Sequence, residues 1–182
     1  MASASLERAL KLAVVTGLRA ALGPALIAHA RNRPEKQTLA LAALGEMVFD
    51  KLPMVPSRDS LLPLLARGAA GAWVASQCAE ESDEAADPWA MPLGAAVAMG
   101  VAVAAPKIRR TLGWTTGLPQ PVLGLIEDYL ALKLGTEALG IPMDQLSTVA
   151  RESVEGLRER FEHLELPDSV RSALQSVGAG SM

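Results

Sequence analysis

Four carboxylates, in two closely spaced pairs, lie well within apolar stretches of this 182-residue chain. Glu46 and Asp50 are four residues apart, so a helix would place them on one face, where they repel each other unless a cation or a proton lies between them. Glu127 and Asp128 are adjacent in a later stretch. Carboxylates in such surroundings can bind a cation, carry a proton or form structural ion pairs. Their positions in the sequence are compatible with all three roles.

Basic residues in the same stretches could neutralise these carboxylates. Arg19, Lys51, Arg67 and Lys133 supply four positive charges against the four negative ones. A charge at the centre of a bilayer costs at least about 2.5–3.5 kcal/mol, so we expect the eight groups to form pairs or to line a wet cavity. The predicted intramembrane polar site consists of Arg19, Glu46, Asp50, Lys51, Arg58, Arg67, Glu127 and Asp128.

Two functional interpretations follow from these charges. In the first, the protein is a small transporter or channel whose carboxylates handle a cation, a proton or a small solute. In the second, it is a non-transporting membrane scaffold or interaction protein, and the charges are structural salt bridges. Neither histidine lies near a plausible nucleophile in the sequence. We therefore expect no catalytic residues and do not favour an enzyme.

The composition excludes several other classes of site and partner. The net charge of −3 argues against nucleic acid as a partner. Cys78 is the single cysteine, so an internal disulfide is excluded. With two histidines, His29 and His163, the chain lacks the residues of an ordinary zinc site. We expect no metal and no cofactor.

Five apolar stretches must position the charged residues. One of them, residues 88–106, has 19 residues without a charge. As a helix it would be about 28 Å long, close to the hydrocarbon thickness of a bilayer, about 30 Å. Another, residues 38–52, has only 15 residues, so it is a tilted span, a half-helix or a re-entrant segment. The five stretches are residues 9–30, 38–52, 61–79, 88–106 and 118–141.

These stretches predict an all-α fold, a small polytopic membrane helix bundle over residues 1–142. We expect four to five embedded helices, some of them broken or re-entrant, with the lipid bilayer and a second copy of the chain as partners. A soluble helical bundle is the alternative. The absence of a polar face in residues 88–106 argues against it, because a helix that is apolar all round is buried or lies in a membrane.

The charges between the stretches predict an orientation in the inner (cytoplasmic) membrane. Lys107, Arg109 and Arg110 should lie in the cytoplasm, and the acidic residues 80–87 outside. A fully spanning second stretch would then place the basic residues 31–36 outside, against the same rule. Either that stretch does not span, or these bases are tolerated outside, so the orientation of the N-terminus stays open.

Glycine and proline surround Arg19 in the first stretch. Gly17 precedes it, and Gly23 and Pro24 follow it. Proline lacks the backbone N–H donor and bends or breaks a helix. Broken helices beside charged side chains are typical of transporters, although proline kinks are also common in membrane helices.

The sequence becomes more polar after Pro142. Residues 143–182 carry four arginines and seven acidic residues, and apolar residues recur there at intervals of four and three, which predicts an amphipathic helix. A second short helix is expected to begin at Asp168 or Ser169. The first helix either binds a partner or folds back on its own domain. Its apolar positions are Ala150, Val154, Leu157, Phe161 and Leu164.

Several motifs resemble, in order, those of the domain-of-unknown-function 4126 family of bacterial membrane proteins. They are GLRAALGPALIA, LGEMVFDKLPMVPSR, LLARGAAGAWVAS and PKIRRTLGWTTGLPQPVLGLIEDYLALKLG, and the resemblance covers about residues 9–140. It implies an integral membrane protein without an assigned biochemical function. The motif positions that it carries over are Gly17, Arg19, Glu46, Asp50, Lys51, Pro53, Pro56, Ser57, Arg58, Arg67, Gly71, Glu127 and Asp128.

The chain is also loosely similar to cation exchangers that repeat a Glu-x-Gly-Asp-Lys motif in two halves. Here Glu46 and Asp50 are one residue further apart, the glycine is missing, and the second copy lacks the lysine. These departures argue against metal transport.

Overall fold

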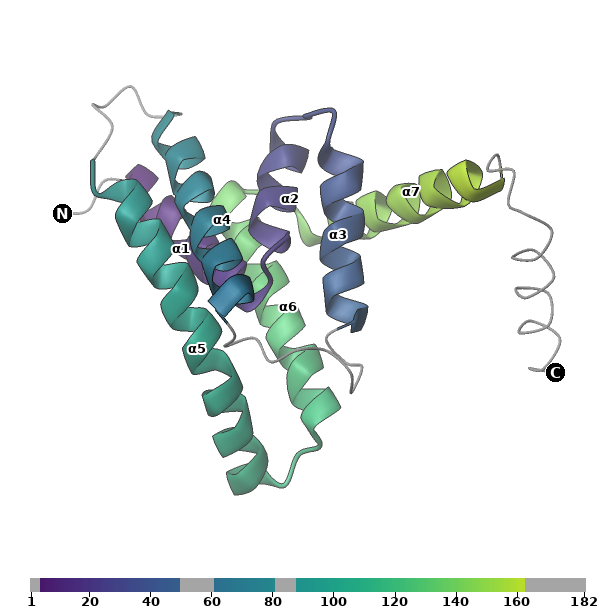
Figure 1. The fold of residues 1–182 in the computed structure, drawn as a ribbon. Helices are drawn as coiled ribbons and strands as arrows, with labels where there is room; N and C mark the ends of the chain where they lie inside the picture. Colours follow the sequence, from purple (N-terminus) through teal and green to yellow (C-terminus); the bar gives the residue numbers. More distant parts are fainter. Residues whose placement is uncertain (1–3, 50–60, 81–87, 163–182) are drawn as a thin grey trace, which may run out of the picture.

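The computed structural model describes residues 4–49, 61–80 and 88–162. All regular structure in these ranges is helical, which confirms the predicted all-α class (Figure 1). The described part of the second apolar stretch, residues 38–49, lies in a helix of 14 residues. The seven helices are α1 (Ala4–Leu18), α2 (Leu22–Ala30), α3 (Lys36–Phe49), α4 (Leu61–Glu80), α5 (Ala90–Thr116), α6 (Gln120–Leu139) and α7 (Met143–Glu162).

The first apolar stretch is broken into α1 and α2, and the break falls at Arg19. Pro24 lies in the first turn of α2, where a missing N–H donor is tolerated, but it cannot continue the hydrogen-bond ladder of α1. The two helices then pack closely across the break, because a Cβ atom on Gly23 would lie 2.0 Å from the hydroxyl oxygen of Thr16. The bend therefore depends on both the proline and the glycine.

Small residues let the central helices approach each other. A Cβ atom on Gly71 of α4 would lie 2.5 Å from the carbonyl oxygen of Gly94 on α5. On α1, a Cβ atom on Gly17 would lie 2.6 Å from the carbonyl oxygen of Ala98, also on α5. Such contacts bring backbones together, as in helix pairs of membrane proteins. Helices α1, α4 and α5 consequently form the tightly packed centre of the bundle.

Among the described helices, α5 is the one long and apolar enough to cross a membrane, as judged by length and composition. Only 22% of its most apolar window is buried, so one side of α5 packs against α1 and α4 while most of the window stays uncovered. It also continues beyond Pro106 to Thr116. The basic residues that we expected in a connection, Lys107, Arg109 and Arg110, therefore lie within α5, and that expectation was wrong.

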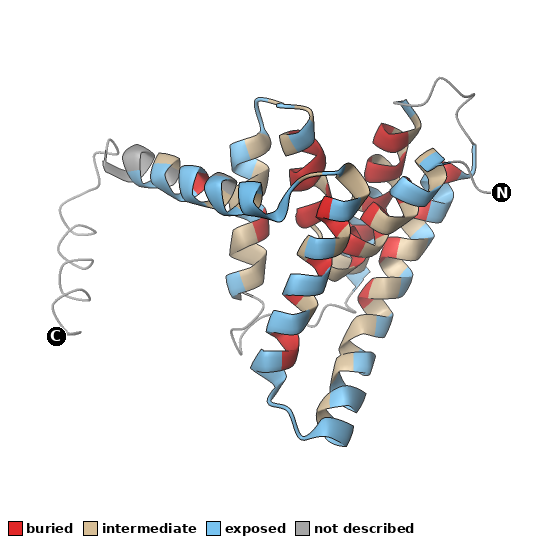
Figure 2. Cartoon of the chain, turned by 180° about the vertical axis from the view of Figure 1, so that it is seen from behind, coloured by how far each residue is buried: buried red, intermediate tan, exposed pale blue. Residues whose placement is uncertain are grey.

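Large apolar side chains point outward on α4, α5 and α6. Seen from behind, α6 is largely exposed and α5 shows both intermediate and exposed residues (Figure 2), and Trp114 is 93% exposed. The exposed large apolar residues of the three helices are Leu61, Leu62, Leu65, Met91, Leu93, Ile108, Leu112, Trp114, Val122, Leu125, Ile126, Tyr129 and Leu130.

The chain turns sharply between α6 and α7. Gly140 ends α6 with a φ of 66°, a conformation that favours glycine, and Met143 begins α7. Helix α7 packs against α3 and buries Ser153 there, whereas Val154 is 53% exposed. The described part of the C-terminal region thus contacts the domain to which it is attached. The expected second helix at Asp168 lies outside the described residues.

Candidate functional site

Arg19 lies at the break between α1 and α2 and is almost completely buried, with 1% of its surface exposed. Its Nε atom donates a hydrogen bond of 2.6 Å to Oδ1 of Asp128 on α6. Its Nη1 atom lies 3.7 Å from Oε1 of Glu127 and donates to the carbonyl oxygen of Leu18. The guanidinium thus joins the break to the middle of α6 through two carboxylates.

Glu127 also contacts a second arginine. Nη1 of Arg109 on α5 lies 3.2 Å from Oε2 of Glu127. The four side chains form a chain of alternating charge, from Asp128 through Arg19 and Glu127 to Arg109, with two positive and two negative groups. These four charges connect the α1–α2 break, α5 and α6, and their sum is zero.

Glu46 reaches the same break from α3. Its two carboxylate oxygens accept hydrogen bonds of 3.0 Å each from the backbone N–H groups of Ala20 and Ala21. Nη2 of Arg67 on α4 lies 2.8 Å from Oε1 of Glu46. The first N–H groups of a helix lack partners within the helix and favour a negative charge. Glu46 therefore satisfies the start of α2 and is itself neutralised by Arg67.

The break is consequently where five of the eight predicted site residues meet. They come from separate elements: the break itself, α3, α4 and α6. Asp50, Lys51 and Arg58 lie outside the described residues. Lys133, which we counted among the interior charges, is 52% exposed in its side chain and lies 3.9 Å from Glu137 on the same helix. The residues brought together are Arg19, Glu46, Arg67, Glu127 and Asp128.

Access to these groups is restricted. A cavity of about 200 Å³ between α1, α5 and α6 is lined by Glu127 and Arg109 and otherwise by apolar or small residues such as Leu18 and Ile126. The Glu127 side chain is only 11% exposed. Within the described ranges, no group of three or more His, Cys, Asp or Glu side chains could hold a metal ion.

Arg109 belongs to the site, although we expected it in a connection between two apolar stretches. It follows Pro106, and a proline commonly ends a helix. Here α5 loses one backbone hydrogen bond at Pro106 and continues, which turns Arg109 toward α6. The sequence signal that could have identified it is the excess of acidic residues on α6, where Glu127 and Asp128 together need two basic partners.

The bases between α2 and α3 meet acidic and polar residues at the end of α4. Nη1 of Arg31 lies 2.5 Å from Oε1 of Gln77 and 3.9 Å from Oε2 of Glu80. The guanidinium of Arg33 also donates to Gln77 and lies 5.6 Å from the ring centre of Trp73. The basic turn and the start of the acidic segment therefore lie at the same end of the bundle.

Comparison with known proteins identifies one family. The model of a domain of unknown function, DUF4126, matches residues 8–150 of the chain. The match covers α2 to α6 and extends into α7. No curated protein and no solved structure matches the chain.

Proposed function

The chain belongs to the domain-of-unknown-function 4126 family, and we propose that it is a multi-pass membrane scaffold whose buried charges hold its helices together. The observation that carries this proposal is that charged side chains lie inside the bundle and large apolar side chains lie on its surface, the reverse of the usual arrangement in water-soluble proteins. Arginine and aspartate side chains are buried at the break, with Arg19 1%, Arg67 6% and Asp128 7% exposed. The outer faces of α4, α5 and α6 carry large apolar residues instead.

The apolar exterior supports embedding in a bilayer. A protein in water gains free energy by burying large apolar side chains, whereas a protein in lipid can leave them outside. Charged residues of membrane helices face the bundle interior and pair with one another. We propose that α4, α5 and α6 cross the membrane, and that α3 and the broken pair α1–α2 complete a bundle of four to five embedded helices. The proposed location is the cytoplasmic membrane of a bacterium.

The pairing of the carboxylates supports a scaffold over a transporter. Glu46, Glu127 and Asp128 each contact an arginine. A transported cation would have to displace an arginine guanidinium from its carboxylate. The displaced guanidinium would then be a buried positive charge without a partner. Breaking such a buried pair costs about 3–5 kcal/mol. These carboxylates are therefore suited to hold helices together.

One observation favours transport as the second candidate. Glu127 and Asp128 converge on a single arginine, and Glu127 lines the cavity of about 200 Å³. A proton could reach Glu127 from this cavity and weaken its contact with Arg109. A transporter would use this exchange in each cycle, whereas a scaffold would not need it.

A flux assay separates the two candidates. The full chain is reconstituted in liposomes that contain a pH-sensitive dye, and proton, sodium and potassium gradients are imposed in turn. The scaffold predicts flux equal to that of empty liposomes for the wild type and for Glu127→Gln. Flux in the wild type that disappears in Glu127→Gln, but not in the surface variant Glu137→Gln, would establish transport and refute the scaffold.

Membrane embedding has its own test. After expression, the full chain should stay in the membrane fraction through an alkaline carbonate wash and require detergent for release. A protein that is monodisperse in buffer without detergent would refute the membrane proposal, whatever the flux assay shows.

A further inference from the structure

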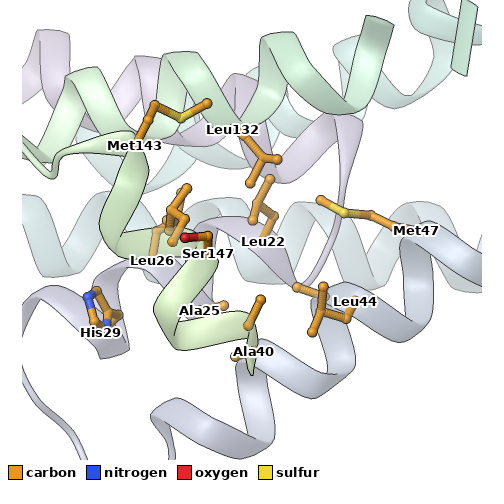
Figure 3. A pocket seen from close by; sticks show the side chains of 13 residues that line it. Leu22, Ala25, Leu26, His29, Ala40, Leu44, Met47, Leu132, Met143 and Ser147 are labelled. Carbon is orange, nitrogen blue, oxygen red and sulfur yellow. The ribbon is translucent and has the colours of Figure 1, made fainter. Parts of the chain in front are cut away.

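A second, larger cavity lies away from the ion pairs, between α2, α3, α6 and α7. Its volume is about 320 Å³, within the range of small-molecule sites, about 300–1,000 Å³. None of its 13 lining residues is charged, and His29 and Ser147 are the two with polar side chains (Figure 3). A lining of this kind favours apolar molecules, because they gain free energy by leaving water.

The cavity is elongated along α2 and α3. It is lined from Leu22 to His29 on α2 and from Ala40 to Met47 on α3. On each helix the first and last lining residues are seven positions apart, which corresponds to a distance of about 10 Å along the helix axis at about 1.5 Å per residue. Figure 3 shows His29 at one end of the cavity and Met47 at the opposite end. This shape suits a single extended apolar chain better than a compact ring.

The two ends of the cavity differ in polarity. Met47, Leu22 and Leu44 make one end apolar. At the other end the imidazole of His29, whose N–H can donate a hydrogen bond, has no hydrogen-bond partner within the described part of the chain. The Ser147 hydroxyl already donates to the carbonyl oxygen of Asp144, at 2.7 Å, so it remains available as an acceptor.

Positive charge follows His29 along the chain. The turn between α2 and α3 carries Arg31 and Arg33, and Lys36 begins α3; the described acidic groups in contact with the two arginines are Glu35 and Glu80. Among the described groups, these three bases and two acids leave one positive charge in excess two or more residues from His29, with Arg31 and Arg33 in contact with Gln77 on α4. An anionic group at this end would be favoured, whereas the apolar end offers no partner for a charge.

We propose that this cavity binds a free fatty acid, with its chain between α2 and α3 and its carboxylate at His29. The two methionines of the lining, Met47 and Met143, have flexible side chains that can adapt to chains of somewhat different shape. The site shares no lining residue with the ion pairs. The proposal therefore goes beyond the scaffold function and does not depend on it.

Photolabelling of the full chain tests this site. The protein is reconstituted in phosphatidylcholine vesicles with dodecanoic acid that carries a diazirine at the end of its chain, and the adducts are mapped by mass spectrometry after irradiation. Adducts are expected around Leu22, Leu44 and Met47, at the apolar end. Ala40→Phe should fill part of the cavity and reduce this labelling about tenfold, because the larger side chain occupies space that the fatty-acid chain would use and so weakens its binding. Ala96→Phe, on the exposed face of α5, should leave it unchanged.

A second comparison tests the polar end and does not rely on the folding of Ala40→Phe. His29→Ala should weaken labelling by the acid about tenfold, as for loss of a hydrogen bond to a charged group, and leave labelling by the matching dodecanol probe unchanged. Equal effects on acid and alcohol, or none on either, would overturn the proposal. So would adducts spread over α5 and α6 that Ala40→Phe does not reduce. Equal labelling by a diazirine phosphatidylcholine would assign the cavity to a membrane lipid and also overturn it.

Discussion

Arg19 and Asp128 form a buried ion pair although 109 positions separate them in the sequence. Nε of Arg19 lies 2.6 Å from Oδ1 of Asp128, and both residues are less than a tenth exposed. The pair ties the break between α1 and α2 to the middle of α6. It is therefore a tertiary constraint on the segment where the hydrogen-bond ladder of α1 ends, with the Arg19 N–H donating to the Val15 carbonyl oxygen.

Asp128→Ala should strongly destabilise the protein. Removal of one partner of a buried pair leaves an uncompensated charge, so we expect the free energy of unfolding to fall by about 3–5 kcal/mol. The double variant Arg19→Met/Asp128→Leu should recover much of this loss, because both charges are then absent. Equilibrium unfolding in detergent with increasing denaturant measures the change.

Lys133→Ala is the matched control for this experiment. It removes a basic residue of α6 whose ion pair with Glu137 is exposed, and exposed pairs contribute about 0–1 kcal/mol. If Lys133→Ala destabilised the protein as much as Asp128→Ala, burial of the Arg19–Asp128 pair would not be the source of its effect.

Glu46→Gln should loosen the start of α2. A glutamine can accept with one oxygen where the carboxylate uses two, so at least one N–H of Ala20 and Ala21 loses its partner, and Arg67 loses its counter-charge. We expect faster amide hydrogen exchange in residues 19–23 and unchanged exchange in α5. Exchange rates at Ala20 and Ala21 equal to those of the wild type would contradict the assigned role of Glu46.

Two glycines on neighbouring helices should respond to alanine in opposite directions. Gly71→Ala places a Cβ atom 2.5 Å from the Gly94 carbonyl oxygen, so α4 and α5 must move apart, at a cost of about 1–3 kcal/mol. Gly100→Ala meets no atom within 4 Å and should stabilise α5 by about 0.5–1 kcal/mol. The midpoint of thermal unfolding, followed by circular dichroism, measures both. A loss of stability in both variants would show that close approach at Gly71 is not the cause.

The sequence predicted the helical class, and Pro24 indicated a bend in the first apolar stretch, because both follow from local signals. Apolar stretches without strand periodicity indicate helices, and Pro24 limits how far α1 can continue. It also indicated that the carboxylates inside the apolar stretches need partners, and in the structure Glu46, Glu127 and Asp128 each contact an arginine. Those predictions depend on residue type and on neighbours within one or two helical turns.

The pairing of the charges could not be predicted, because it depends on how the helices pack. Nothing local distinguishes Arg67 from Lys133 as a partner of Glu46, yet the Gly71–Gly94 contact fixes how α4 packs in the bundle, and Lys133 lies at the surface. Arg109 was missed for the same reason, since its role requires α5 to continue beyond Pro106. The number of membrane-spanning helices also remains a prediction.

The contact between Arg31 and Glu80 leads to a prediction about topology. It places the α2–α3 turn beside the end of α4, whereas α5 runs from Ala90 to Thr116 and carries the chain to the far end of the bundle (Figure 1). Starting from a Cys78→Ala background, the single variants Asn32→Cys and Pro88→Cys should react with a membrane-impermeant maleimide from the same side of the membrane. Thr116→Cys should react from the opposite side.

All three positions are exposed in the structure, so differences in labelling report the side of the membrane and not burial. Labelling is compared in intact spheroplasts and in inverted vesicles. Positive charge at Lys107, Arg109 and Arg110 favours the cytoplasm for the end of α5, so Thr116→Cys should react in inverted vesicles and the other two in spheroplasts. Labelling of Asn32→Cys and Pro88→Cys from opposite sides would contradict the packing of Arg31 against Glu80. Labelling of all three from one side would instead contradict a membrane-spanning α5.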